Sequence, residues 1–414
     1  MSFLAPDRWT SKRLKYVVTL RRSRVTGVEN ERPYIALENI ESLTGRLIGE
    51  PFAIDTDSSI TPDDESLTNT FEPGDVLFGK LRPYLAKAWV ANFSGRCSTE
   101  LLVMQPIEVS ARFLLYVCLS REFIYAVNAS TFGSKMPRAE WDFISNMPVP
   151  VPPSTHQFLI VDYLDRETAR MDALIAAKGQ SLELLEEKRS ALVTQAVTRG
   201  LDPHIQFRDS GISWLGQIPI HWQIERARWL FRERDQRSQS GEEELLTVSH
   251  ITGVTPRSEK DVNMFEAETT EGYKICFAGD LVINTLWAWM GAMGVSPTLG
   301  IVSPAYNVYK PSSLFEPKYV DALVRMRTFA QEVTRYSKGV WSSRLRLYPE
   351  GFFEVFLPVP PLAEQRAIAN YIAEETEKLE NLRSATEATI LLLKERRNAL
   401  ISETVTGNMT PSAP

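Results

Sequence analysis

The sequence is poor in the residues that carry metal and thiol chemistry. Its 414 residues include three cysteines and four histidines. The cysteines stand far apart at positions 97, 118 and 276. An odd, scattered set of this kind predicts neither a disulfide framework nor a metal-binding pair. The histidines form no ligand pair either. We therefore expect a protein of the reducing cytoplasm that holds no metal and no cofactor of its own.

Motifs of catalysis, membrane insertion and export are also missing. The sequence has no glycine-rich phosphate loop, no HExxH, CxxC or GxSxG, and no Asp/Asn-Pro-Pro-aromatic tetrad of amino-methyltransferases. The apolar stretch from Leu281 to Val295 contains Asn284 and is shorter than the ~20 residues of a membrane span. The first residues lack the apolar core of a signal peptide. These absences favour a non-catalytic cytoplasmic protein.

Basic residues are not in excess. The chain has 46 Lys and Arg against 52 Asp and Glu, a net charge of −6. A strongly basic nucleic-acid domain is therefore not visible in bulk, and any phosphate contact must come from local patches. The length favours two to three domains, and the 43% hydrophobic content is ordinary for globular proteins.

The sequence does contain one long stretch twice. Residues 152–199 reappear 208 positions later (360 minus 152) as residues 360–407. The residues that return unchanged in one register include Gln157, Tyr163, Glu167, Thr168, Leu174, Ala191, Leu192, Val197 and Thr198. So many matches in one register indicate an internal duplication.

Both copies have the apolar spacing of a long helix that packs along a partner. Steps of four and three residues connect the apolar positions, which gives the 3.5-residue period of coiled coils. Polar residues interrupt this row at the same places in both copies, which favours pairing between them. Each helix would span about 40 residues, or roughly 60 Å. The expected pairing residues are Ile160, Leu164, Met171, Leu174, Leu185, Leu192, Ile368, Ile372, Leu379, Leu382, Leu393 and Leu400.

The segments before the two copies share an order of features although their sequences differ. Each begins with a proline and a tryptophan, continues with a basic cluster and short apolar strands, and ends in a proline-rich entry to the long helix. We predict an α/β (α+β) protein with two pseudo-symmetric domains and an antiparallel coiled coil. The expected division is 1–151 for the first domain, 152–199 for the first helix, 200–218 for a linker, 219–359 for the second domain, 360–407 for the second helix and 408–414 for a tail.

Two pairs of loops are the candidates for recognition. The first pair offers cations around an aromatic ring, which suits phosphates and guanine edges; its residues are Lys80, Arg82, Tyr84, Lys87, Lys135 and Arg138. The matching pair replaces most of the charge by tryptophan; its residues are Trp287, Trp289, Ser342, Arg344 and Arg346. A solvated surface turn or a buried tryptophan pair is the alternative interpretation of each loop taken singly.

Several passages resemble the specificity (S) subunits of type I restriction-modification systems. They are the helix entries from Pro152 to Gln157 and from Pro360 to Gln365, the helix ends Arg189 to Leu192 and Arg397 to Leu400, and the linker passages Val197 to Pro203 and Asp209 to Trp222. The resemblance covers essentially the whole length. It implies two target-recognition domains that read the halves of a split DNA sequence, with paired helices that set their spacing.

The resemblance also implies partners and cofactors. The expected partners are double-stranded DNA, two modification subunits that methylate adenine with S-adenosylmethionine, and restriction subunits that use ATP and Mg. The chain itself would be a DNA-binding subunit without catalysis. The competing hypothesis is a pseudo-symmetric protein-interaction scaffold that does not bind DNA. Salt separates the two, because phosphate contacts weaken steeply as salt rises.

Overall fold

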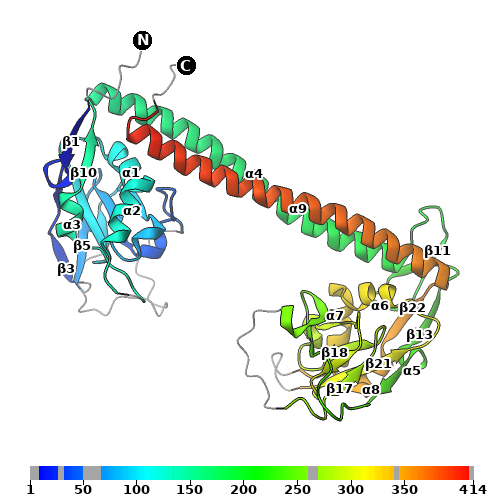
Figure 1. The fold of residues 1–414 in the computed structure, drawn as a ribbon. Coiled ribbons are helices and arrows are strands. Elements are labelled where there is room, and N and C mark those ends of the chain that lie inside the picture. The colour runs from blue at the N-terminus through cyan, green and yellow to red at the C-terminus, as the bar shows by residue number, and fades with distance from the viewer. Residues whose placement is uncertain are drawn as a thin grey trace. The chain divides into compact units, whose positions relative to one another are not determined.

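The computed structural model describes residues 9–26, 32–49, 67–133, 135–259, 269–339 and 345–409. Two compact units make up the chain: residues 1–180 with 386–414, and residues 181–385. The chain passes from one unit to the other within two long helices, α4 (Ser154–Arg199) and α9 (Leu362–Val405) (Figure 1). Each unit therefore combines one α/β domain with the first part of one long helix and the last part of the other.

The domain of the first unit is built on two four-stranded sheets, with orders β2-β9-β6-β7 and β3-β5-β8-β4. Helices α1 and α2 pack on the first of these sheets. The strands are β1 (Thr10–Arg13), β2 (Val18–Leu20), β3 (Arg24–Thr26), β4 (Tyr34–Ile35), β5 (Leu67–Phe71), β6 (Val76–Gly79), β7 (Ala88–Val90), β8 (Gly95–Cys97), β9 (Leu101–Pro106) and β10 (Pro148–Val151). The helices are η2 (Leu14–Tyr16), η4 (Leu37–Asn39), η5 (Pro83–Leu85), α1 (Ala111–Leu119), α2 (Arg121–Ala129) and α3 (Trp141–Asn146).

The domain of the second unit has a four-stranded sheet of order β14-β21-β18-β19. Its strands are β11 (Phe207–Asp209), β12 (Gln217–Pro219), β13 (Gln223–Arg226), β14 (Phe231–Arg234), β15 (Leu246–Ser249), β16 (Gly253–Pro256), β17 (Lys274–Cys276), β18 (Leu281–Asn284), β19 (Met293–Val295), β20 (Gly300–Val302), β21 (Tyr306–Pro311) and β22 (Phe356–Val359). Its helices are α5 (Ala227–Leu230), η6 (Arg257–Glu259), η7 (Ala288–Met290), α6 (Pro317–Val324), α7 (Arg327–Tyr336) and α8 (Pro349–Glu354).

The two domains share one topology. The antiparallel sheet β2-β9-β6-β7 corresponds to β14-β21-β18-β19, and the pair β1 with β10 corresponds to β13 with β22. A buried ion pair also recurs: Arg21 lies 2.7 Å from Asp75, and Arg234 lies 2.8 Å from Asp280. The duplication visible in the helices therefore extends through the domains, as the sequence predicts.

A glutamine fixes the beginning of each long helix. The Gln157 side chain accepts a hydrogen bond from the Ser110 backbone N–H (2.8 Å) and donates one to the Pro152 carbonyl (2.9 Å). The Gln365 side chain does the same with the Glu316 N–H (2.9 Å) and the Pro360 carbonyl (2.8 Å). Both glutamines are buried, and each hydrogen bond ties the long helix to the residue just before a domain helix, α1 or α6. This contact explains why the duplication preserves glutamine there.

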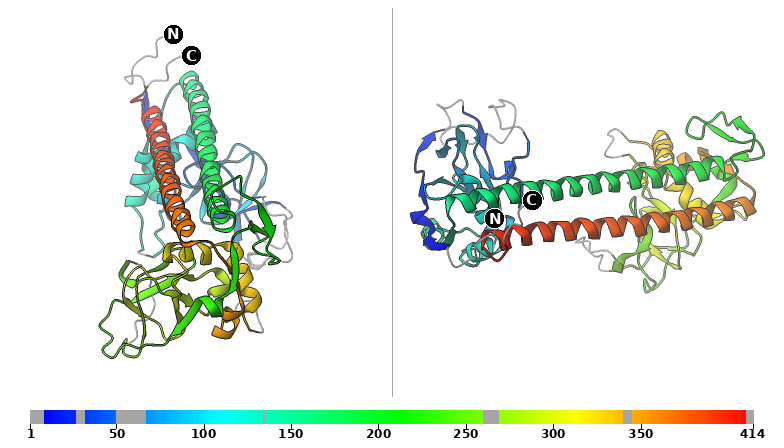
Figure 2. Two further views of the ribbon diagram at one scale, coloured as in Figure 1. Left: turned by 90° about the vertical axis from the view of Figure 1, so that its right-hand side faces the viewer. Right: turned by 90° about the horizontal axis from the view of Figure 1, so that it is seen from above.

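The long helices pack in opposite directions within each unit. In the first unit, Ile160 and Leu164 of α4 share a core with Ile401 and Val405 of α9. In the second unit, the end of α4 packs with the beginning of α9, through Val197 and Ile368 among others. Figure 2 shows both helices as continuous ribbons, and they contain 46 and 44 residues. The predicted α/β class and the antiparallel helices are confirmed.

The expected pairing residues differ in burial. Ile160, Leu164, Met171, Ile368, Leu379 and Leu400 are buried, and Leu185, Leu192, Ile372 and Leu393 are partly buried. Leu174 and Leu382 are instead 45% and 53% exposed, while Ile175, the residue after Leu174, is partly buried. In α4, Thr168 rather than Glu167 is buried one turn earlier, which moves the buried row by one residue. An α-helix of 3.6 residues per turn departs in this way from a strict 3.5-residue pattern.

Candidate functional site

In the first unit, the two candidate loops meet. The loop after β6 begins at Lys80, and the second loop runs up to Ala139. The Arg82 N–H donates to the Pro137 carbonyl (2.8 Å), and the Ala139 N–H donates to the Lys80 carbonyl (3.0 Å). Segments about 50 residues apart in the sequence therefore form one surface, which we call the first recognition surface: Lys80–Lys87 with Lys135–Arg138.

Three cations of the first recognition surface are available to a ligand. Arg82 and Lys135 are exposed and Lys80 is partly exposed. Among the described residues, no acidic side chain forms an ion pair with any of the three. The Tyr84 ring is 51% exposed beside them. The surface thus offers cationic donors next to an aromatic face, a combination that suits phosphate and base contacts.

The other two predicted cations have partners within the domain. Arg138 pairs with Glu100 through two contacts, Nη2 to Oε1 at 3.0 Å and Nε to Oε2 at 3.1 Å. The Lys87 ammonium donates to the Leu37 carbonyl (2.8 Å), and desolvation by burial lowers the pKa of Lys87. Lys87 therefore holds the loop on the domain. Glu100, which the sequence analysis did not single out, leaves Arg138 partly neutralised.

In the second unit the matching loops also meet. The Leu347 N–H donates to the Thr285 carbonyl (3.0 Å), and the Arg346 Nε donates to the Thr285 hydroxyl (3.2 Å). The second recognition surface consists of Asn284–Met290 with Leu345–Tyr348. Ser342 and Arg344 lie outside the described residues.

The second recognition surface is aromatic. The rings of Trp287 and Trp289 are stacked, with centroids 6.3 Å apart and planes 19° apart. Trp287 is 51% exposed and Trp289 is partly exposed. The Arg346 guanidinium lies 5.4 Å from the centroid of the Tyr348 ring. The surface therefore offers exposed aromatic faces and one partly buried guanidinium, where the first offers cations.

Most of the basic clusters near the beginning of each domain are occupied internally. Lys12 pairs with Glu108 at 2.6 Å, and Arg21 with Asp75. Arg226 and Arg228 both pair with Glu354. These basic residues hold strands and turns of their own domain together. The repeated Gly-Asp turns at Gly74-Asp75 and Gly279-Asp280 are the sequence signal that could have identified one such pair in advance.

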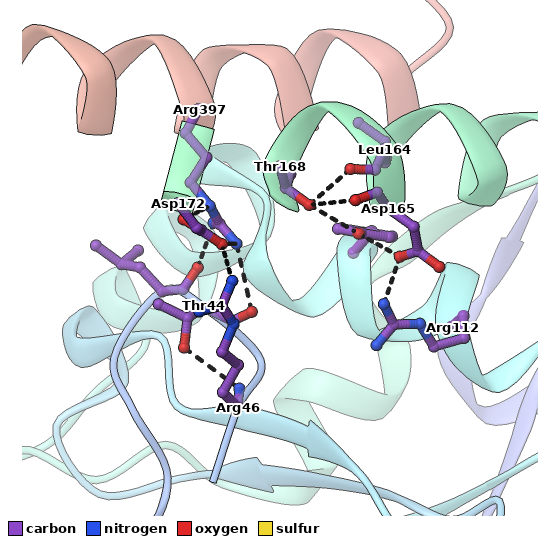
Figure 3. A network of polar contacts seen from close by, with 10 residues as sticks. Thr44, Arg46, Arg112, Leu164, Asp165, Thr168, Asp172 and Arg397 are labelled. Atoms are coloured by element: carbon purple, nitrogen blue, oxygen red, sulfur yellow. Dashed lines mark hydrogen bonds and ion pairs between the residues drawn. The ribbon is translucent and has the colours of Figure 1, made fainter. Parts of the chain in front are cut away.

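A polar network joins the long helices to the first domain (Figure 3). The buried guanidinium of Arg397 in α9 lies 2.9 Å from Asp172 in α4. It also donates to the carbonyls of Leu43 (2.7 Å) and Thr44 (3.3 Å). Arg46 approaches Asp172 from the same loop. Beside this group, Asp165 binds Arg112 and the Tyr116 hydroxyl. The first domain is thus attached to both helices at once.

The described part of the chain shows no group of three or more His, Cys, Asp and Glu residues that could hold a metal ion. Within the same part, no helix is both long and apolar enough to cross a membrane. The three cysteines are buried and free.

Comparison with known proteins gives relatives of one kind. No family model matches the sequence. The "Type I restriction enzyme EcoDI specificity subunit" of Escherichia coli is 26% identical over 195 residues, which are 46% of this chain. The chain spans less than half of that relative, 42% of its length.

Solved structures show the same fold over nearly the whole chain. A chain from a type I R-M system superposes with a TM-score of 0.74 and 18% identity, over 99% of this chain and 100% of that one. The HsdS subunit from Thermoanaerobacter tengcongensis superposes with a TM-score of 0.56 and 18% identity, over 98% and 99%. Partial sequence similarity and full-length fold together show that the chain resembles the specificity subunits of type I restriction-modification systems.

Proposed function

We propose that the chain is the DNA-recognition subunit of a type I restriction-modification complex. It would bind a bipartite target, with the first recognition surface on one half and the second on the other. It would carry no catalytic site. Methylation with S-adenosylmethionine, and cleavage with ATP and Mg, would belong to modification and restriction subunits in the same cytoplasmic complex.

One observation carries the proposal: two domains of the same topology present different chemistry at the equivalent place. The loop after β6 offers Arg82 and Tyr84, whereas the loop after β18 offers Trp287 and Trp289. A duplicated protein that bound one symmetric ligand would gain nothing from this difference. Two unlike surfaces in one chain suit two unlike half-sites, and hence an asymmetric target.

The chemistry suggests how each half would be bound. Lys80, Arg82 and Lys135 can contact phosphates or guanine edges in the major groove. The stacked tryptophans offer flat apolar faces that can pack against sugar or a partly unstacked base. The spacer bases between the half-sites would be contacted at phosphate or not at all, so the spacer sequence would be free.

The charge distribution supports a shared grip on DNA. Acidic residues outnumber basic ones, 52 to 46, and several arginines are already paired within the domains. Phosphate contacts provide much of the free energy of binding DNA, and this chain offers few. We therefore infer that modification subunits, docked on the chain, complete the clamp around the duplex.

The test is a titration of labelled duplexes with the purified chain, alone and with its modification subunits, at two salt concentrations. We expect weak binding by the chain alone, and tight, sequence-specific binding with the subunits that weakens steeply as salt rises. If the chain is instead a protein-interaction scaffold, neither preparation should show DNA binding that weakens as salt rises. Nanomolar specific binding by the chain alone would contradict the shared clamp.

The independence of the two halves can be tested in cells. Residues 1–151 would be exchanged for the equivalent segment of a relative, and the methylated motif determined by methylome sequencing. We expect a change in one half of the motif only, because each domain has its own core. A change in both halves would show that the two surfaces do not act separately.

A further inference from the structure

The two recognition surfaces share one backbone frame, although their side chains differ. In the first unit, Arg82 stands just before η5, and its carbonyl accepts a hydrogen bond from the Leu85 N–H (2.9 Å). In the second unit, Trp287 stands just before η7, and its carbonyl accepts one from the Met290 N–H (3.0 Å). Arg82 and Trp287 therefore occupy equivalent positions, so a cation in one domain corresponds to an aromatic ring in the other.

A second pair of equivalent positions lies beside each surface. Phe132 and Arg138 exchange two backbone hydrogen bonds (3.1 and 3.2 Å), and Lys338 and Arg346 do the same (both 2.9 Å). The segment of Arg138 also bonds to the loop after β6, and the segment of Arg346 bonds to the loop after β18. We call this place the bridge position: Phe132 in the first domain and Lys338 in the second. Here the aromatic ring belongs to the first domain and the cation to the second.

Both residues at the bridge position are available to a ligand. The Phe132 side chain is 74% exposed. Lys338 is exposed as well, and among the described residues no acidic side chain forms an ion pair with it. Burial of an exposed ring against another apolar group is favourable, so Phe132 is a residue that gains from contact with a partner.

The exchange leaves one cation and one aromatic ring at these two positions in each domain. The first domain has Arg82 and Phe132, and the second has Lys338 and Trp287. A DNA duplex offers groups that match both: phosphates along its backbone and, in the major groove, the methyl group of thymine, which phenylalanine can contact. A loop that only faced water would gain nothing from a ring as exposed as that of Phe132.

We propose, on the basis of the proposed function, that the bridge position contacts DNA in both domains. Phe132 packs against the methyl group of a thymine in the half-site of the first domain, where it is a specificity-determining residue. Lys338 binds a phosphate in the half-site of the second domain. It supplies the cation that the sequence after β18, from Thr285 to Gly291, lacks. One place in the duplicated frame thus reads a base in one half-site and positions the backbone in the other.

The test of Phe132 uses the full chain with its modification subunits and duplexes in which deoxyuridine, which lacks only the methyl group, replaces one thymine at a time. The half-site of the first domain is the half that changes when residues 1–151 are exchanged. We expect one replacement to weaken binding about three- to fivefold, the effect of one buried methyl group. Phe132→Ala should weaken binding of the thymine duplex about five- to tenfold and bind the two duplexes equally, because the contact is already lost.

Tyr16→Ala is the matched control for Phe132→Ala. Tyr16 is 60% exposed and precedes β2, where Val18 pairs with Pro106 at one end of β9. The recognition loop begins at the other end of β9, where Gly79 pairs with Leu101. Tyr16→Ala should therefore leave both the affinity and the effect of deoxyuridine unchanged.

The test of Lys338 is the salt dependence of binding by the same complex. Lys338→Met should make the slope of the logarithm of the binding constant against the logarithm of the salt concentration less steep by about one unit, and should leave the methylated motif unchanged. Phe132→Ala should keep the slope, because it removes no charge. Lys310→Met is the matched control, since Lys310 is exposed on β21 at the end away from Tyr306, which pairs with Asn284.

Two results would overturn the proposal. The first is a Phe132→Ala complex that still distinguishes thymine from deoxyuridine as the unchanged complex does, and the second is an unchanged salt slope in Lys338→Met. Thermal unfolding checks that each variant is folded. If the unchanged complex binds its motif tightly, either result removes the bridge position from the interface and leaves the proposed function intact. An unchanged complex that does not bind DNA would overturn both.

Discussion

Arg82 has a backbone conformation that side chains rarely adopt. Its φ is 50° and its ψ is 60°, in the left-handed region, and Ala86 four residues later has a φ of 47°. Such a conformation costs roughly 1–2 kcal/mol per non-glycine residue. Backbone strain of this kind gathers at functional sites, where it fixes a side chain in place. Here it holds an exposed guanidinium in the middle of the first recognition surface.

Arg82→Ala is expected to lower DNA affinity of the assembled complex by about three- to tenfold. The slope of the logarithm of the binding constant against the logarithm of the salt concentration should become less steep by about one unit, as expected for the loss of one phosphate contact. Folding should not change, because alanine has the same backbone cost. Lys12→Met is the matched control: its ammonium pairs with Glu108 outside the first recognition surface, so the salt dependence should stay as it is. Equal slopes for Arg82→Ala and the unchanged protein would remove Arg82 from the interface.

The cysteines are expected to be unreactive in the folded protein. Burial raises the pKa of the Cys97 thiol to about 12 and raises that of Cys118 and Cys276 as well. At pH 8 a thiol with a pKa of about 12 is thiolate in only about one molecule in ten thousand. A thiol-specific chromogenic reagent should therefore detect no fast-reacting group in the native chain and three in denaturant. One fast thiol in the native chain would show that a cysteine is reached by solvent.

The same thiols predict how stability changes with pH. Each pKa is higher in the folded chain than in the unfolded chain, so the unfolded chain loses its protons first as pH rises. Each protonated thiol therefore contributes fully to the free energy of unfolding below pH ~8.5. Above that pH the free energy of unfolding falls by up to ~1.4 kcal/mol for each thiol and for each unit of pH. Urea unfolding at pH 8 and pH 9.5 measures this loss. Cys276→Ala should lessen it.

At the scale of elements, the two long helices differ in the burial of one arginine that both copies contain. Arg397 is 4% exposed and binds Asp172, Leu43 and Thr44. Its counterpart in the first copy, Arg189, has a 46% exposed side chain and pairs with Glu186 on its own helix. Arg397 therefore helps to attach the first domain to both long helices, as Figure 3 shows. Among the described residues, Arg189 does not make the equivalent contact in the second unit, because it pairs with Glu186 on its own helix.

Arg397→Ala is expected to destabilise the first unit by about 2–3 kcal/mol. The loss would leave the partly buried Asp172 carboxylate with Arg46 alone, and the carbonyls of Leu43 and Thr44 without their guanidinium donor. Arg189→Ala should cost well under 1 kcal/mol, because it removes only an exposed pair. Hydrogen exchange of the backbone around residues 40–48 localises the effect. Faster exchange there in Arg189→Ala as well would contradict the asymmetry.

These two arginines show how far the sequence alone could lead. The shared register predicted both long helices, their direction and the α/β class, because apolar periodicity and turn residues are local signals. It could not show that Arg397 is buried and Arg189 exposed. That difference depends on the loop at Leu43 and Thr44, which is more than 350 residues away in the sequence.

The candidate sites show the same difference between local features, which the sequence predicts, and long-range contacts, which it does not. Loop composition singled out Lys80, Arg82, Trp287 and Trp289, but it could not reveal that Lys87 and Arg138 are bound internally. Lys87 lies against a carbonyl of η4, and Arg138 against Glu100 before β9. Contacts of this kind arise from strand pairing between distant segments, and an exposed and an occupied cation look alike in sequence.

For the whole molecule, we propose that the two long helices, within which the chain passes between the units, would set the spacing of the two half-sites. Both helices cross from one unit to the other near residues 180 and 385. Seven residues added to each helix at these points would preserve the pairing faces and lengthen the pair by about 10.5 Å. This length corresponds to about three base pairs at 3.4 Å each.

We expect the protein with both insertions to methylate a motif whose halves are unchanged and whose spacer is about three base pairs longer. An insertion in α4 alone is the control. It would displace the residues of α4 against those of α9 in one unit, for example Val197 against Ile368, and should abolish a defined spacer or the fold. Methylome sequencing of cells that express each variant with the modification subunits gives the motif directly. Half-sites with altered bases, or an unchanged spacer in the double insertion, would mean that the helices do not set the distance between the two recognition surfaces on DNA.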